Sequence, residues 1–94
     1  MIKALHPEIR NLRGLWGLYI THNMLTTLPA ELNQIPRLFL IDAEHNCITH
    51  IPAALSMAPR LDRLYLRGNP LKSIPEEVKQ MPSMLELTFD EVQQ

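Results

Sequence analysis

The sequence predicts an α/β solenoid, with a parallel β-sheet on its concave face and short helical turns or irregular segments on its convex face. Asparagine recurs at positions 23, 46 and 69, a constant step of 23 residues. Two proline columns and seven apolar columns keep the same step. A fixed period of this length marks a repeat architecture, in which similar coils stack on one another. The proline columns are Pro29, Pro52, Pro75 and Pro36, Pro59, Pro82.

Each coil is expected to contain one short strand. Leu18 and Ile20 have apolar equivalents in every later coil. Because side chains alternate across a strand, both would point inward while the residue between them points outward. Equivalent strands of successive coils would then pair in parallel, about 4.8 Å apart.

The asparagine and proline columns mark where each coil turns. An asparagine amide both donates and accepts, so it can satisfy backbone groups that a turn leaves unpaired inside the core. Pro29 and its equivalents suit the first position of a helical turn, because proline fixes φ and needs no N–H partner there. Pro36 and its equivalents would end that turn before the next strand.

The repeat unit reads LxxLxLxxNxLxx(L/I)PxxLxxxP and resembles a leucine-rich repeat. The resemblance covers essentially the whole chain. The 23-residue length with a Leu-Pro or Ile-Pro pair is similar to the intracellular class found in Ras-scaffold, plant Ras-group-related and some bacterial proteins. It is longer than the 20-residue unit typical of bacterial ubiquitin-ligase effectors. The resemblance implies a non-catalytic module for protein–protein interaction or scaffolding. The alternative is a substrate-recognition segment of a larger signalling enzyme or bacterial effector.

We expect a single domain over residues 1–94, since 94 residues suffice for only one small core. Terminal coils of solenoids usually need polar caps, and only Glu8, Arg10 and residues 90–94 are candidates. The chain is therefore expected to be either a fragment of a longer protein or a minimal solenoid that self-associates end to end. The expected divisions are an N-terminal half repeat 1–14, full repeats 15–37, 38–60 and 61–83, and a closing strand and tail 84–94.

Composition and charge limit the partners and the cellular location that we expect. The net charge is −1, which gives no general attraction to nucleic acid or anionic membranes, and no apolar run approaches the length of a membrane span. The N-terminal residues lack the apolar centre of a signal peptide, and Cys47 has no partner for a disulfide. A cytoplasmic location is expected, with an exported bacterial effector acting in a host cytosol as the alternative.

Aromatic residues concentrate on the outward strand positions. Trp16, Tyr19, Phe39 and Tyr65 lie there, whereas Phe89 alone should point inward. Interface centres are rich in such residues, although aromatic side chains also have high strand propensity. These positions, which we call the concave sheet face, are Trp16, Gly17, Tyr19, Thr21 and His22; Phe39, Leu40, Asp42, Glu44 and His45; Asp62, Arg63, Tyr65, Arg67 and Gly68; and Leu85, Glu86, Thr88, Asp90 and Glu91.

Charge is also segregated. The concave sheet face carries six acids and two bases, a net charge of −4, which disfavours nucleic acid and favours a basic protein patch. Alternatively, Glu44, Arg67 and Asp90 share one column and could pair locally as a ladder of alternating sign. We expect a protein partner to contact Trp16, Tyr19, Phe39, Asp42, Glu44, Arg63, Tyr65 and Arg67.

Catalytic and metal chemistry has little support in the pattern. His22 and His45 share one column and Cys47 is close in sequence, but zinc needs three or four converging ligands. Cys47 follows the strand, and no orienting group or pocket for a nucleophile is recognisable. No metal, no cofactor and no catalytic residue is therefore expected.

Overall fold

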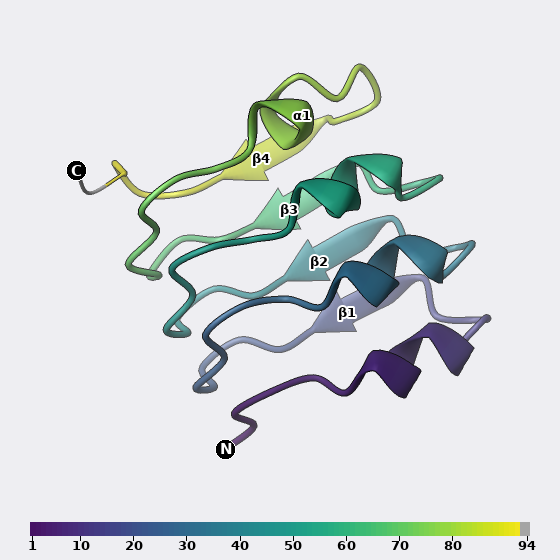
Figure 1. Ribbon diagram of the computed structural model, residues 1–94, viewed down its shortest axis with the longest axis horizontal. Coiled ribbons are helices and arrows are strands. Elements are labelled where there is room, and N and C mark those ends of the chain that lie inside the picture. Colours follow the sequence, from purple (N-terminus) through teal and green to yellow (C-terminus); the bar gives the residue numbers. More distant parts are fainter. Residues whose placement is uncertain (93–94) are drawn as a thin grey trace.

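The chain alternates between short helical turns and strands of three residues. The computed structural model describes residues 1–92, so Gln93 and Gln94 of the expected tail lie outside the described part. The elements are η1 (Pro7–Asn11), β1 (Gly17–Tyr19), η2 (Ala30–Gln34), β2 (Leu40–Asp42), η3 (Ala53–Met57), β3 (Arg63–Tyr65), α1 (Glu76–Lys79) and β4 (Glu86–Thr88). Figure 1 shows the strands in one layer and the helical turns in a second layer.

The four strands form one parallel sheet in the order β1-β2-β3-β4. Leu18 pairs with Ile41, Ile41 with Leu64, and Leu64 with Leu87, so the register advances by the same 23 residues that the sequence repeats. The ladder continues past the strands, where the Ala43 N–H donates to the Tyr65 carbonyl at 2.9 Å. The predicted α/β solenoid is confirmed.

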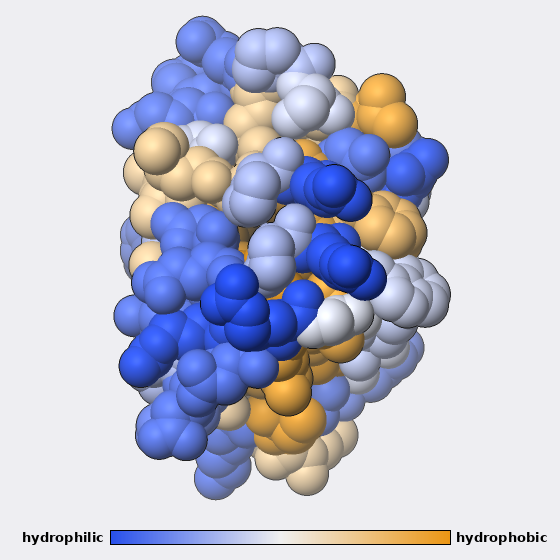
Figure 2. Space-filling view, turned by 90° about the vertical axis from the view of Figure 1, so that its right-hand side faces the viewer, coloured by the Kyte–Doolittle hydropathy of each residue, from blue (hydrophilic) through white to orange (hydrophobic). Residues whose placement is uncertain are grey.

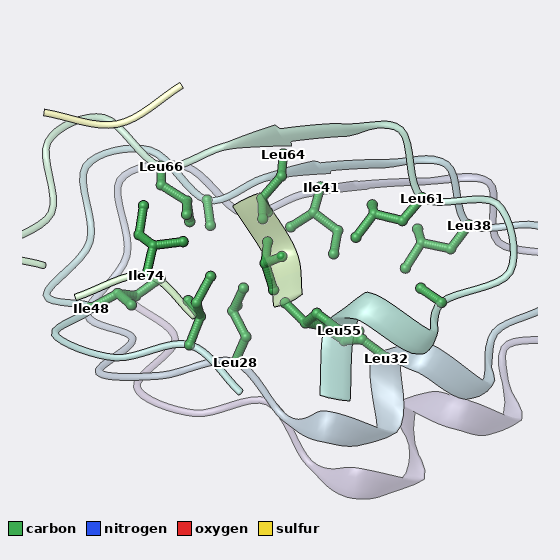
Figure 3. Close-up of a cluster of buried hydrophobic side chains, with 14 of the residues drawn as sticks. Leu28, Leu32, Leu38, Ile41, Ile48, Leu55, Leu61, Leu64, Leu66 and Ile74 are labelled. Atoms are coloured by element: carbon green, nitrogen blue, oxygen red, sulfur yellow. The ribbon is translucent and has the colours of Figure 1, made fainter. Parts of the chain in front are cut away.

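The apolar core fills the space between the two layers. Ile41 and Leu64 point inward from the sheet, and Leu32 and Leu55 meet them from the helical turns (Figure 3). All four side chains are fully buried. Burial of this kind contributes about 1.5–3 kcal/mol for each such residue, so the core supplies most of the driving force for stacking.

Burial decreases toward both ends of the stack. Equivalent apolar side chains in the terminal coils are only partly buried, because they have a neighbouring coil on one side only. Ile2 and Leu12 are exposed at the N-terminal end. Figure 2 shows the edge where the chain passes from helical turns into strands, with a hydrophobic area at its lower, N-terminal end. The partly buried side chains are Leu5, Ile9, Leu15, Leu18, Met84, Leu87 and Phe89.

Asparagine side chains hold successive coils together. Asn46 Nδ2 donates to the carbonyl oxygens of Ile20 and Ala43, both at 3.0 Å, and Asn46 Oδ1 accepts from the Leu25 N–H at 3.1 Å. Two of these partners belong to the preceding coil, so one amide joins two coils.

Asn69 repeats this arrangement one coil later. Its Nδ2 donates to Ala43 and Leu66, and its Oδ1 accepts from the Ile48 N–H. Asn23 accepts from the Ile2 N–H at 2.9 Å. The three asparagines therefore occupy equivalent bends, as the 23-residue step predicts.

The prolines act one residue earlier than the sequence suggests. Pro29, Pro52 and Pro75 lie directly before the helical turns rather than at their first positions. The Pro29 carbonyl accepts the first bond of its turn, from the Leu32 N–H at 3.2 Å. A proline needs no N–H partner at either position. The turn therefore begins at the residue after the proline, whose carbonyl accepts the first hydrogen bond.

We predict that Asn46→Ala lowers the free energy of unfolding by about 3 kcal/mol, because it removes four hydrogen bonds and leaves the Leu25 N–H of the preceding coil without a partner. Urea denaturation followed by circular dichroism measures the change. Asn11→Ala is the control, since this exposed side chain makes no hydrogen bond within residues 1–92; a loss for Asn46→Ala no larger than the control's contradicts the prediction.

Candidate partner-binding face

The Trp16 ring contacts two other aromatic rings at the N-terminal end of the concave sheet face. Trp16 and Phe39 stack with ring centroids 5.6 Å apart and an interplanar angle of 13°. Tyr19 meets Trp16 edge to face, with centroids 6.4 Å apart. Trp16 is 55% exposed and Tyr19 is 61% exposed. We call these three residues the aromatic platform.

The backbone positions the platform. Trp16 and Phe39 are equivalent residues of adjacent coils, and the Phe39 N–H donates to the Trp16 carbonyl at 2.9 Å. This bond holds the two rings side by side. Tyr19 lies over Gly17, where an added Cβ would come within 3.0 Å of its ring. The missing side chain at Gly17 therefore leaves the space in which Tyr19 approaches Trp16.

Two carboxylates without a basic partner lie beside the platform. Asp42 is the register partner of Tyr19 on one side and of Tyr65 on the other. Its Oδ1 accepts from the Glu44 N–H at 3.3 Å. Within residues 1–92, no basic side chain forms an ion pair with Asp42 or Glu44. Their negative charges are therefore available to an external cation.

The C-terminal half of the face is paired internally. Arg63 Nη1 lies 3.1 Å from Asp62 Oδ1, and Arg63 Nε lies 3.4 Å from Glu86 Oε1. The Tyr65 hydroxyl donates to the same Glu86 oxygen at 3.2 Å. Partial burial and the Glu86 carboxylate raise the pKa of Tyr65, so this hydroxyl keeps the proton that it donates.

Sequence reasoning missed two members of this network, Asp62 and Glu86, as site residues. The available signal was the shared column of Arg63 and Glu86, which places opposite charges directly across adjacent strands. The expected ladder of Glu44, Arg67 and Asp90 is wrong, because no ion pair joins these residues in the described chain.

Asp90 takes another role. Its Oδ2 accepts from the Gly68 N–H at 2.7 Å. The equivalent N–H groups of His22 and His45 bind backbone carbonyls of the next coil, at Glu44 and Arg67. The Asp90 side chain supplies this acceptor in the last coil, which explains why it does not turn toward Arg67. Arg67 is exposed.

The two histidines predicted to be neighbours stack their rings, with centroids 4.6 Å apart. His22 and His45 have φ values of 57° and 58°, and Gly68 in the same column has φ 79°. Cys47 is exposed. No group of three or more histidine, cysteine or acidic side chains comes together as a possible metal site within residues 1–92.

Comparison with known proteins identifies the class of this stack. A leucine-rich-repeat sequence profile matches residues 13–71, which is more than half of the chain. The chain belongs to the leucine-rich-repeat family. Proteins with this fold generally act in protein–protein interaction.

A solved leucine-rich-repeat protein from Leptospira interrogans has the same fold. It aligns over 96% of this chain with a TM-score of 0.88 and 29% sequence identity. The chain spans 23% of the length of that protein. No curated protein matches the sequence. No helix in the described part of the chain has the length and apolar character that crossing a membrane requires.

We predict that Phe39→Ala makes the indole of Trp16 more accessible, because the stacked ring covers one of its faces. Acrylamide quenching of Trp16, the sole tryptophan, should increase, while far-ultraviolet circular dichroism stays unchanged. Leu85→Ala is the matched control, since Leu85 is an exposed apolar residue of the same column, directly before the last strand β4. Equal quenching in wild type and Phe39→Ala would show that the rings do not stack in solution.

Proposed function

We propose that this chain is a non-catalytic protein-interaction module that binds a protein partner on its concave sheet face. The observation that carries the proposal is the aromatic platform of Trp16, Tyr19 and Phe39. Exposed aromatic clusters mark contact sites, because burying them in an interface removes a large apolar area from water.

Strand propensity is a weaker explanation of these rings. Trp16 and Phe39 each lie one residue before the strands β1 and β2, and neither belongs to the buried core. Trp16 and Tyr19 leave more than half of their surfaces in water. Folding therefore gains little from their aromatic character, whereas a partner would gain an apolar contact area.

Charged residues around the platform would set specificity. Asp42 and Glu44 present unpaired negative charge, and Arg67 presents exposed positive charge. Arg63 and Tyr65 are tied to Glu86 and would contact a partner as a fixed surface. This combination of an apolar centre with a charged surround is typical of specific interfaces.

We predict that Tyr19→Ala combined with Phe39→Ala lowers partner affinity at least tenfold, because each ring lies at the centre of the proposed interface. Affinity capture with quantitative mass spectrometry, using lysate of the source organism, compares this variant with wild type. Met57→Ala on the convex side is the control, since Met57 is 74% exposed. If partners captured by wild type are retained by the folded double variant, the concave-face proposal fails.

A second candidate function is substrate recognition within a larger signalling enzyme or exported effector. This chain matches 23% of a longer leucine-rich-repeat protein from Leptospira interrogans, so a stack of this size can form part of a larger protein. Sequencing the gene and its transcript tests this candidate: a reading frame that adds an enzymatic domain supports it, and a frame limited to this chain removes it.

A further inference from the structure

The carboxylates of the concave sheet face fall into two sets. Asp62 and Glu86 both pair with Arg63, which balances one of their two charges, and Asp90 accepts from the Gly68 N–H. Asp42 and Glu44 have no such cation within residues 1–92. Two like charges held on one strand repel each other, so a cation from outside would relieve this repulsion. Beside the aromatic platform, the unpaired negative charge is thus that of Asp42 and Glu44, on β2 and its C-terminal continuation. Glu91, after β4, is the other acid of this face without an ion pair in the described residues.

The aromatic platform lies next to that negative charge. Asp42 is the register partner of Tyr19, whose ring contacts Trp16. Trp16 and Phe39 stack directly, so the rings form a surface and leave no slot between them. Of the two long basic side chains, arginine has the planar guanidinium, which stacks on aromatic rings and also binds carboxylates with two N–H groups.

The positions of the exposed arginines determine at which end of the strands a basic group of the partner would bind. Arg37 and Arg60 are exposed before the strands β2 and β3, at the opposite end from Glu44. Asp42 lies five residues after Arg37, a separation of at most about 16 Å. A basic group would be repelled at the first end and attracted at the second, where Asp42 and Glu44 outnumber the exposed Arg67 of the next coil. Its apolar neighbours would then cover Trp16 and Phe39.

We infer that the partner segment bound on the concave sheet face is basic and contributes an arginine to Asp42 and Glu44, beside Tyr19. This inference rests on the proposed function, because it names the chemistry of the occupant of the same face. The guanidinium pairs with the two carboxylates, and an adjacent apolar side chain packs on the rings of Trp16 and Phe39. A phosphate-rich ligand would meet the unpaired carboxylates and be repelled.

Trp16 provides the measurement, because it is the sole tryptophan and belongs to the platform. The probe is a short synthetic peptide of alternating arginine and leucine, titrated into the full chain while Trp16 fluorescence is recorded. Two matched peptides replace every arginine by lysine or by glutamate. We expect the arginine peptide to bind several-fold more tightly than the lysine peptide, and the glutamate peptide not to bind.

The variant Asp42→Asn with Glu44→Gln should weaken the arginine peptide about tenfold and reduce the salt dependence of binding. Glu31→Gln with Glu77→Gln removes the same charge from the convex side and should leave binding unchanged. This control separates a contact at Asp42 and Glu44 from general attraction of a cationic peptide to the chain.

Two results overturn the inference while leaving the proposed function standing. The first is equal binding of the arginine peptide by wild type and Asp42→Asn/Glu44→Gln, with weaker binding by Tyr19→Ala/Phe39→Ala. The second is no binding of any peptide by wild type, while the captured partner still depends on Tyr19 and Phe39. Light scattering that shows a dimer broken by Tyr19→Ala/Phe39→Ala also overturns it, because a second copy then covers the face. If both Asp42→Asn/Glu44→Gln and Tyr19→Ala/Phe39→Ala still bind the peptide and the partner as wild type does, the concave-face function itself is wrong.

Discussion

The hydrogen bonds of the asparagine amides are the constraint on which the rest of the structure depends. Each coil must turn its backbone inward after the strand, and the turn leaves carbonyl and N–H groups facing an apolar core. Asn46 and Asn69 satisfy these groups in their own coil and in the coil before it. An unsatisfied buried polar group costs about 1–3 kcal/mol, so other arrangements of the bend are disfavoured.

This constraint also determines the outer surface. Because the bends are equivalent, strands pair with a constant register and residues 23 apart lie side by side. Trp16 and Phe39 stack for this reason, and so do His22 and His45. Arg63 reaches Glu86 across the same spacing. The candidate site is thus a consequence of the repeat, although none of its side chains contributes to the buried core.

The period predicts the architecture well because it records the core directly. Every fully buried leucine and isoleucine in the central coils lies in an apolar column, and alternation along the strand places Tyr19 and Asp42 outside. Columns do not predict which neighbours interact. Glu44, Arg67 and Asp90 share a column without pairing, because the last coil uses Asp90 as a backbone acceptor. Nor does the period reveal that Tyr19 lies over Gly17, since that contact depends on ring orientation.

The left-handed backbone at His22, His45 and Gly68 has a consequence for how this surface can vary. Residues with positive φ are restricted mainly to glycine, asparagine, aspartate and histidine, and β-branched side chains are strained there. At Gly68, an added Cβ would also meet the His45 ring, at 2.5 Å from Nδ1. Solvent exposure normally permits wide substitution over evolutionary time. In this column the backbone conformation limits which residue types are tolerated, although the positions are exposed to water.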